Sequence, residues 1–171
     1  MSLFQRIIYR YLRPVHIYES IFDVDFGALY DDGIRSLFFD IDNTIISYIE
    51  SDVSLQTINL FNQIKSYGFD SIILLSNHSN IDRVNTVANQ LDLPGVAFAC
   101  KPFVFTARRI MKDYSMSSNS TAIIGDQLST DILIGNALNL VSIFVDPINV
   151  ADVSTLKRIQ YRFQQLILDS F

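Results

Sequence analysis

The chain has 171 residues, enough for one domain that buries roughly 70% of the surface exposed by its unfolded chain, so it needs no covalent staple. Its formal net charge of −5 argues against a general nucleic-acid binder, because such proteins need a basic face to displace counterions. One cysteine excludes an internal disulfide, and no apolar run reaches the ~18 residues of a membrane span, so we expect a single cytoplasmic domain over residues 1–171.

Residues 1–20 are expected to form an amphipathic helix and a connector. Apolar side chains recur at helical spacing between residues 3 and 12, Arg6, Arg10 and Arg13 fall mostly on other faces, and Pro14 ends the helix. A basic amphipathic helix can lie on an anionic membrane surface. It can also pack on the protein's own core, and we favour that alternative because terminal helices are more often used in this way.

The string Asp23-Val24-Asp25 places two carboxylates one residue apart, but no strand precedes it. Residues 26–30 predict a short helical turn that Gly33 closes. We therefore expect a turn here and no catalytic site.

Residues 36–44 contain the strongest candidate for chemistry. Leu37 to Ile41 is a short run of apolar, mostly aromatic or branched side chains, which predicts a buried strand. Alternation along a strand would point Asp40 and Asp42 the same way at its carboxyl end. Two buried like charges are costly without a cation or a shared proton, so the pair predicts a metal site. The alternative is a turn or helix cap, the usual role of such strings.

The rest of the chain alternates helical and extended patterns. Helices are predicted over residues 54–67, 81–91, 103–114, 130–138 and 153–171, and strands over residues 71–75, 96–99, 121–124 and 141–145. In the helix over 81–91, the side chains expected to point inward are Ile81, Val84, Val87, Ala88 and Leu91. In the last helix, in the segment 151–171, one face should carry Leu156, Ile159, Phe163, Leu166 and Ile167. Such alternation predicts an α/β fold, a parallel sheet of about five strands with helices on both faces.

Polar residues follow the strands at the points where the strands end. Ser76 and Asn77 follow the second strand, Lys101 the third and Asp126 the fourth. In a parallel sheet these positions meet at one edge, where ligands bind. Taken singly, Ser76-Asn77 would be an ordinary helix cap and Lys101 a solvated loop lysine, but their coincidence with the first motif favours one site.

Four strings carry a resemblance to a known family. Asp40-Ile41-Asp42-Asn43-Thr44, Ser76-Asn77, Lys101-Pro102 and Gly125-Asp126-Gln127-Leu128-Ser129-Thr130-Asp131 resemble the four motifs of the haloacid dehalogenase (HAD) superfamily of phosphatases, in particular its YqeG branch within subfamily IIIA. The resemblance covers residues 21–147 and implies a Rossmann-like HAD core. A family relative in mitochondria acts on phosphatidylglycerophosphate, so a lipid of that kind is one substrate that the resemblance implies.

The resemblance implies a phosphomonoesterase, and the residue types suit that chemistry. Asp40 would attack phosphorus to form an aspartyl-phosphate, and Asp42 would protonate the leaving oxygen and then take a proton from water. Ser76 and Asn77 would hydrogen-bond the phosphoryl oxygens, and Lys101 would offset their charge.

Mg²⁺ is the cofactor that the resemblance implies. Its ligands would be the carboxylates of Asp40 and Asp126 and the backbone carbonyl of Asp42, with water completing the octahedron. Asp131 would orient Lys101 or a metal-bound water, and Thr44 would support the ligands from the same outer layer.

The spacing of the motifs leaves no room for a sizeable cap domain, because most residues between Asp40 and Lys101 are assigned to helices and strands. Enzymes that select small metabolites usually close a lid over the site. An open site suits a phosphate on a lipid headgroup, a protein or a nucleic-acid end, and a lipid substrate would bring peripheral contact with a membrane surface. A homo-oligomer could instead supply the lid, with the terminal helices as its contacts.

A second class of function stays open, a low-turnover regulatory or partner-binding domain that keeps the fold. A receiver-type signalling module is disfavoured, because Asp42 beside Asp40 is the acid–base group that makes hydrolysis fast. His78 either touches the leaving group or is simply exposed. Cys100 has no visible catalytic partner, and we expect it to be a small packed residue.

Overall fold

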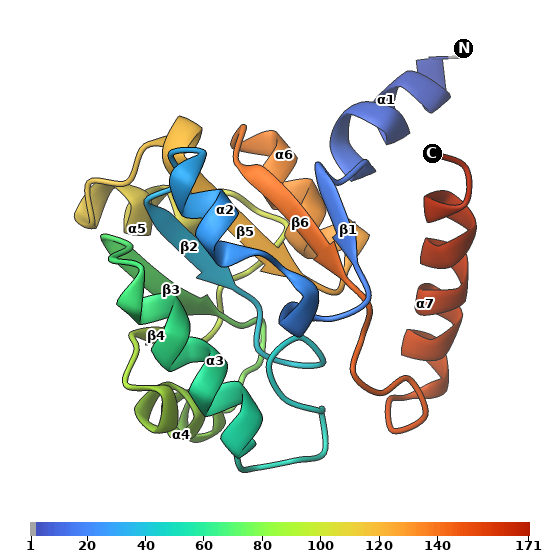
Figure 1. Cartoon of the computed structure of the whole chain (residues 1–171). Helices are drawn as coiled ribbons and strands as arrows, with labels where there is room; N and C mark the ends of the chain where they lie inside the picture. The colour runs from blue at the N-terminus through green and yellow to red at the C-terminus, as the bar shows by residue number, and fades with distance from the viewer. Residues whose placement is uncertain (1–2) are drawn as a thin grey trace.

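The centre of the fold is a parallel sheet of six strands in the order β1-β6-β5-β2-β3-β4. Figure 1 shows the computed structural model, which describes residues 3–171. The strands are β1 His16–Tyr18, β2 Ser36–Phe39, β3 Ser71–Leu75, β4 Gly95–Val96, β5 Thr121–Gly125 and β6 Val141–Val145. The sheet confirms the predicted parallel α/β class. Chain order reverses at β2, which lies between β3 and β5, so a crevice is expected at its carboxyl end.

Two strands at the sheet edges differ from the prediction of about five strands. The additional strand, β1, was not predicted because three residues are too short to show a period, and it is held by pairing with β6. Strand β4 is shorter than the predicted 96–99. Phe98 and Cys100 have positive φ angles of 50° and 57°, and these end the extended path.

Helices cover both faces of the sheet, as predicted. They are α1 Leu3–Leu12, α2 Phe26–Asp31, α3 Leu55–Ser66, α4 Ile81–Leu91, α5 Phe105–Asp113, α6 Leu133–Ala137 and α7 Thr155–Leu168, with short helical turns η1 Ile21–Asp23, η2 Ser118–Ser120 and η3 Leu128–Ile132. Helices α2, α3 and α4 pack on the face that carries Leu37 and Phe39 of β2, whereas α5 and α6 pack on the face of Phe38. The alternation along β2 thus puts one large aromatic side chain on each face of the sheet, Phe39 on the first and Phe38 on the second.

Side-chain caps and glycines set the helix ends on the first face. Ser54 Oγ accepts a hydrogen bond from Thr57 N at 3.1 Å at the start of α3, and Gly68, with a φ of +88°, follows its end. Asp25 Oδ1 accepts from Ala28 N at 2.8 Å and caps α2. The first Asp-x-Asp string therefore belongs to a turn, as expected, and its Asp25 also caps α2.

One residue of the predicted inward face of α4 is misplaced. Ile81 is 53% exposed, whereas the other four residues are buried in the core: Val84, Val87, Ala88 and Leu91. Ile81 is the first residue of the helix, directly after its cap Asn80, so its side chain lies beyond the end of the core. The prediction was wrong at this position.

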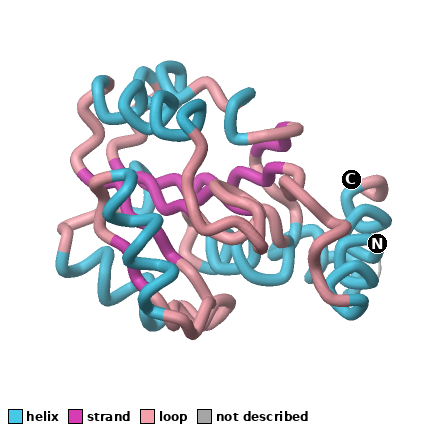
Figure 2. Tube along the Cα trace, turned by 90° about the horizontal axis from the view of Figure 1, so that it is seen from below, coloured by secondary structure: helices cyan, strands magenta, loops and turns pink. Residues whose placement is uncertain are grey.

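The last helix, α7, turns its apolar residues outward. Leu156, Ile159, Phe163 and Leu166 are exposed, and Ile167 alone of the predicted stripe packs partly against the small cluster of Leu128, Ile132 and Phe144. The buried side chains of α7 are Tyr161 and Gln164. Figure 1 shows α7 beside β1 and β6 at one edge of the molecule, and Figure 2 shows both chain ends on that side. No helix within residues 3–171 has the length and apolar character needed to cross a bilayer.

Candidate active site

A buried lysine lies at the base of a crevice formed by the carboxyl ends of the central strands. Lys101 Nζ donates to Asp40 Oδ1 at 2.5 Å, to Asp131 Oδ1 at 2.6 Å and to the carbonyl oxygen of Leu75 at 2.8 Å. The side chains of Lys101, Asp40 and Asp131 are each at least nine-tenths buried. The structure thus brings together three residues that the sequence places far apart.

The local backbone explains how Asp40 and Asp42 reach this crevice. Asp40 N still donates to the carbonyl of Ile124 in β5, so this residue ends the sheet pairing. Asn43 then adopts a left-handed conformation with a φ of 65°, which asparagine tolerates, and the chain curls back so that Ile45 N donates to the carbonyl of Ile41. The turn leaves Asp40 at the base of the crevice and Asp42 nearer its mouth.

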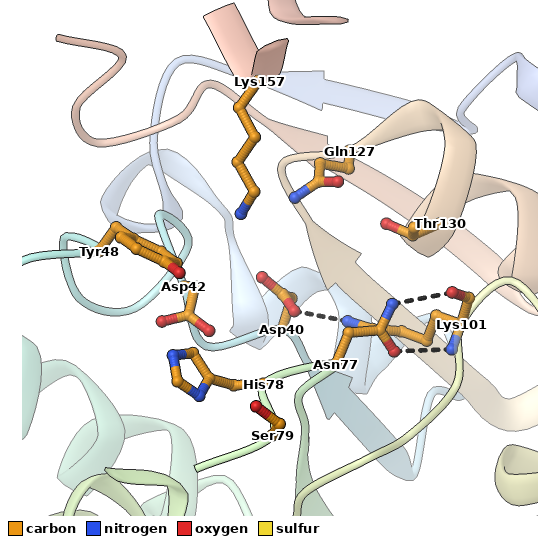
Figure 3. A pocket seen from close by; sticks show the side chains of 10 residues that line it. All are labelled: Asp40, Asp42, Tyr48, Asn77, His78, Ser79, Lys101, Gln127, Thr130 and Lys157. Atoms are coloured by element: carbon orange, nitrogen blue, oxygen red, sulfur yellow. Dashed lines mark hydrogen bonds and ion pairs between the residues drawn. The ribbon is translucent and has the colours of Figure 1, made fainter. Parts of the chain in front are cut away.

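Asn77 holds the loop that carries the lysine. Its Nδ2 donates to the Lys101 carbonyl at 2.8 Å, and its Oδ1 accepts from Lys101 N at 2.7 Å (Figure 3). The side-chain amide, expected to contact phosphate, is therefore engaged with the backbone of Lys101. Ser76 Oγ accepts from His78 N at 2.9 Å and donates to Asp42 Oδ2 at 3.3 Å.

A π-helical turn positions the fourth motif. In η3, the Ile132 N–H reaches the carbonyl of Gln127, five residues earlier, and this wider turn directs Asp131 back toward the sheet. Gly125 makes the approach possible, because a Cβ at this position would lie 2.4 Å from Asp131 Cγ. Asp131 Oδ2 also accepts from Gln127 N at 3.2 Å, which fixes its orientation.

Burial changes the acid–base properties of the central groups. It raises the pKa of the Asp40 carboxyl to about 7, although Lys101 acts in the opposite direction. Burial likewise raises the pKa of Asp126 well above its usual range, and the nearby Asp40 adds to the effect. Burial alone would lower the pKa of Lys101, but Asp131 and Asp40 outweigh it and raise that pKa above its ordinary value. The lysine is therefore charged, and Asp40 and Asp126 bind protons more readily than free carboxyls do, so a bound cation would compete with protons for them.

Three carboxylates suit a divalent cation. Asp40, Asp126 and Asp131 each offer an oxygen, and these atoms lie within 4.8 Å of one another in a buried setting. Thr44 Oγ1 lies 3.4 Å from Asp40 Oδ2 and 3.5 Å from Asp126 Oδ1, so it links two of them. Carboxylate oxygens are the ligands that Mg²⁺ prefers, and burial together with the neighbouring carboxylates raises the pKa of Asp40 and of Asp126.

Sequence reasoning missed the partner of Asp42. Arg83 Nε in α4 donates to Asp42 Oδ1 at 3.0 Å, and its Nη2 donates to the Ser47 carbonyl at 3.0 Å. The arginine thus joins the predicted acid–base residue to the loop that follows the first motif. No local pattern could reveal this pair, because the two residues are distant in sequence and Arg83 lies in a predicted helix, outside its predicted inward face.

The crevice above these groups has a volume of about 340 Å³ and is open to solvent. Figure 3 shows that Tyr48, His78, Gln127 and Lys157 line it around Asp40 and Asp42. His78 Nδ1 accepts from Asn80 N at 2.9 Å. Tyr48 and Lys157 were not predicted.

Helix α7 contributes two buried side chains that contact Asp126. Tyr161 Oη donates to Asp126 Oδ2 at 2.5 Å and accepts from Asn43 Nδ2 at 3.2 Å. Gln164 Nε2 donates to the Asp126 carbonyl at 2.7 Å, and its Oε1 accepts from Leu128 N at 2.7 Å. Tyr161 and Gln164 were also missed, although two polar residues three apart opposite an apolar stripe are a signal that this face meets polar groups.

Cys100 does not match its prediction. It is exposed and not packed, with a left-handed φ of 57° in the turn before the cis Lys101–Pro102 bond. The turn directs its side chain outward and that of Lys101 into the crevice.

Sequence comparisons agree with the motifs. Residues 98–171 match the HAD-hydrolase-like family. Over 143 residues, 84% of this chain and 82% of the relative, the chain is 25% identical to the probable phosphatase YqeG of Bacillus subtilis (strain 168).

Two solved structures share the fold. An uncharacterized protein from Listeria monocytogenes serotype 4b superposes with a TM-score of 0.55 at 11% identity, covering 75% of this chain and 99% of that one. The cobalt-bound deoxy-D-mannose-octulosonate 8-phosphate phosphatase (YrbI) of Haemophilus influenzae superposes with a TM-score of 0.50 at 14% identity, covering 81% of this chain and 89% of that one.

The motifs and these sequence matches show that the chain is similar to HAD-type hydrolases, and the two solved structures share its fold. The relative from Bacillus subtilis, which is named a probable phosphatase, supports a phosphatase.

Proposed function

We propose that residues 1–171 form one phosphatase domain, a Mg²⁺-dependent phosphomonoesterase that acts through an aspartyl-phosphate on Asp40. The observation that carries the proposal is the buried contact of Lys101 with Asp40 and Asp131 at the base of an open crevice. A carboxylate held beside a buried cation is placed to receive a phosphoryl group, whose charge that cation offsets.

In the first step, an Asp40 carboxylate oxygen attacks phosphorus. The bond from phosphorus to the leaving oxygen breaks, and Asp42 gives its proton to that oxygen. Both oxygens of Asp42 are engaged with Arg83 and Ser76, so this step requires that one contact opens toward the leaving group.

In the second step, a water molecule attacks the phosphorus bound to Asp40. Asp42 takes a proton from this water, the bond between phosphorus and Asp40 breaks, and inorganic phosphate leaves. The Asp40 carboxylate is restored, so the cycle balances without any further reactant.

The other site residues bind and orient. Lys101 offsets charge on the phosphoryl oxygens, and Asp131 orients Lys101 through their ion pair. Asn77 lines the side of the crevice, and Ser76 orients Asp42 through its hydrogen bond. Asp40, Asp126 and the backbone carbonyl of Asp42 would hold Mg²⁺, and Thr44 supports the two carboxylates. When bound, the cation would withdraw charge from the transferring phosphoryl group.

The proposed substrate is a phosphate on a large or lipid-linked molecule. The crevice is open, and the adjacent α7 exposes Leu156, Ile159, Phe163 and Leu166. The same helix contains three cations and no acid. An apolar stripe with cations on the same helix supports peripheral contact of a cytoplasmic protein with an anionic membrane surface.

The α7 stripe also favours a second candidate, a partner-binding protein with low turnover. A macromolecular partner would cover the same four exposed side chains. The two candidates differ in whether purified protein turns over a phosphate ester, so a kinetic test separates them.

Two substitutions test the mechanism on p-nitrophenyl phosphate with Mg²⁺. Asp40→Asn keeps the shape but is not a nucleophile, so activity should fall to background while the protein stays folded. Asp42→Asn should reduce turnover by about 10²–10⁴-fold and accumulate phosphorylated Asp40, because water activation is lost.

The matched control is Asp32→Asn, a change of the same kind at an exposed carboxylate, which should leave turnover unchanged. Near-wild-type activity of Asp40→Asn would rule out the covalent route. Folded wild-type protein without turnover on any phosphate ester would favour the partner-binding candidate.

A further inference from the structure

Lys157 reaches the mouth of the crevice from α7. It lines the same crevice as Asp40 and Asp42, and Figure 3 shows its ammonium group directed down into that space. The ammonium nitrogen lies 4.6 Å from the centroid of the Tyr48 ring. Among residues 3–171, no carboxylate forms an ion pair with Lys157, in contrast to Lys101 at the base. Its charge is therefore available to a ligand.

The fold fixes the position of this cation. Lys157 lies one helical turn before Tyr161 on α7. Tyr161 and Gln164, on the same face of the helix, form hydrogen bonds with Asp126 of the fourth motif. Ser154 Oγ accepts from the Lys157 backbone N–H at 3.4 Å and caps the helix at this point. These contacts hold the backbone of Lys157 beside the crevice, and the Tyr48 ring contacts its ammonium group there.

Tyr48 is anchored independently on the other side of the mouth. Its backbone N–H donates to Asn43 Oδ1 at 3.3 Å, which ties it to the turn of the first motif. A cation over an aromatic face is stabilised by the ring, and the ammonium keeps donors free for an anion. Lys157 and Tyr48 thus place a positive charge at the mouth of the crevice, above the position proposed for the phosphoryl group.

We propose that Lys157 and Tyr48 form a second subsite, which binds an anionic group of the substrate other than the phosphoryl group that is transferred. The inference rests on the proposed function, because Asp40 defines the end where that phosphoryl group sits. Lys101 is already shared by two carboxylates, and the base of the crevice is otherwise acidic. A second anion therefore binds at the mouth, and the substrate class is a phosphomonoester that also carries a phosphate, phosphodiester or carboxylate.

Matched substrates test this subsite. Alkyl phosphates of three to six carbons, uncharged at the far end, are compared with ω-phosphonoalkyl and ω-carboxyalkyl phosphates of equal length, whose second anion is not hydrolysed. The wild-type protein should prefer an anionic series by about tenfold in kcat/KM, through KM, as a charge-assisted contact predicts. The two anionic series distinguish a phosphate-like group from a carboxylate.

Variants at Lys157 test whether this residue causes the preference for substrates with a second anionic group. Lys157→Gln should abolish it, and Lys157→Arg should keep most of it because the charge is kept. The matched control, Lys112→Gln, removes an exposed lysine on α5 and should leave the preference intact. A preference that persists in Lys157→Gln, or that is absent from the wild type, overturns the subsite.

A binding measurement separates this inference from the proposed function. Calorimetry in Mg²⁺ compares alkylphosphonates with α,ω-alkanebisphosphonates, which need no turnover. One outcome is that no ester is hydrolysed, but bisphosphonates bind about tenfold more tightly than alkylphosphonates to the proteins that keep a cation at position 157, and to no others. The subsite then stands and the proposed function fails. If esters are hydrolysed and neither assay shows the preference, the function stands and the subsite is wrong.

Discussion

At the scale of single residues, the main feature is the burial of carboxyl groups beside few cations. The acidic groups of the crevice are Asp40, Asp42, Asp126 and Asp131, and among residues 3–171 only Lys101 and Arg83 form ion pairs with them. Asp126 has a tyrosine hydroxyl and no ion-pair partner among residues 3–171. It is therefore the carboxyl that gains most from a bound cation.

The raised pKa values predict how stability depends on pH. Burial raises the pKa of Asp40 to about 7 and that of Asp126 well above 3.8, so the folded chain holds more protons than the unfolded chain above pH ~4. In chelator, the free energy of unfolding should therefore fall as the pH rises from about 4 to about 7. Asp126→Asn should flatten this fall and raise the melting temperature at pH 8, because one buried charge is removed.

In the wild-type protein, Mg²⁺ should restore the free energy of unfolding that is lost as the pH rises in chelator. A cation at 100 times its Kd adds ~2.7 kcal/mol, or roughly 5–11 °C in melting temperature for a chain of this size. Asp126→Asn should lose most of this rise. Thermal melts in chelator and in saturating Mg²⁺ measure the melting temperature of each protein and its rise with Mg²⁺. A rise in Asp126→Asn as large as in the wild type would exclude Asp126 as a ligand.

The sequence predicted the residues of this site that belong to compact strings and missed the others. Asp40, Lys101 and Asp126 follow strands, so strand pairing was enough to place them together. Arg83 and Tyr161 lie in helices and reach the site by contacts across the fold. Such contacts depend on how helices pack on the sheet, and helical periodicity does not contain that information.

At the scale of elements, α7 has two faces with different partners. Tyr161 and Gln164 meet the fourth motif, while the apolar stripe faces outward. The sequence predicted the stripe but not its exposure, because periodicity indicates which side chains share a face and not what covers that face. The short β1 and β4 were missed or misjudged for a related reason, since pairing and turn angles decide their length.

Tyr161→Phe tests the contribution of α7 to the proposed metal site. The hydroxyl stabilises the Asp126 carboxylate, so its loss should raise the pKa of Asp126 further and increase the Mg²⁺ concentration for half-saturation by about tenfold or more. Hydrogen exchange should also become faster in Thr155–Leu168, because an anchor of the helix is removed. The readouts are a Mg²⁺ titration of the melting temperature and exchange rates in α7.

The control for this change is Tyr114→Phe, which removes a hydroxyl from a tyrosine that is 49% exposed at the end of α5. It should alter neither readout. An unchanged Mg²⁺ titration in Tyr161→Phe would mean that the helix covers the site without supporting it.

At the scale of the whole molecule, cationic helices contrast with an acidic protein. The net charge is −5, yet α1 and α7 contain arginines or lysines and no acid. Asn136 Nδ2 donates to the carbonyls of Tyr11 and Arg13, each at 2.9 Å, so the end of α1 is tied to α6. The carboxyl end of α1 is thus packed on α6, in line with the alternative favoured from its sequence, whereas α7 presents an exposed apolar surface.

Vesicle binding distinguishes the two helices. Replacing Arg6, Arg10 and Arg13 by Gln should leave sedimentation with anionic liposomes and hydrolysis of a soluble substrate unchanged. Replacing Phe163 and Leu166 by Ser should weaken sedimentation and preserve hydrolysis, because the change removes exposed apolar area and no site residue.

The outcome that would contradict this assignment is a salt-sensitive loss of vesicle binding in the arginine variant alone. If neither variant changes vesicle binding but the serine variant elutes as a smaller species, the α7 stripe is a contact between copies of the chain.

The position of β2 between β5 and β3 has a consequence for folding. Ser36 pairs with Ser71 on one side and with Thr121 on the other, so the strand that delivers Asp40 joins segments from both halves of the chain. Pairing over such separations requires the closure of long loops and is slow compared with helix formation. During refolding, the cation pocket would thus mature in the final cooperative step, after most helical signal has returned, and recovery of activity would lag behind recovery of secondary structure.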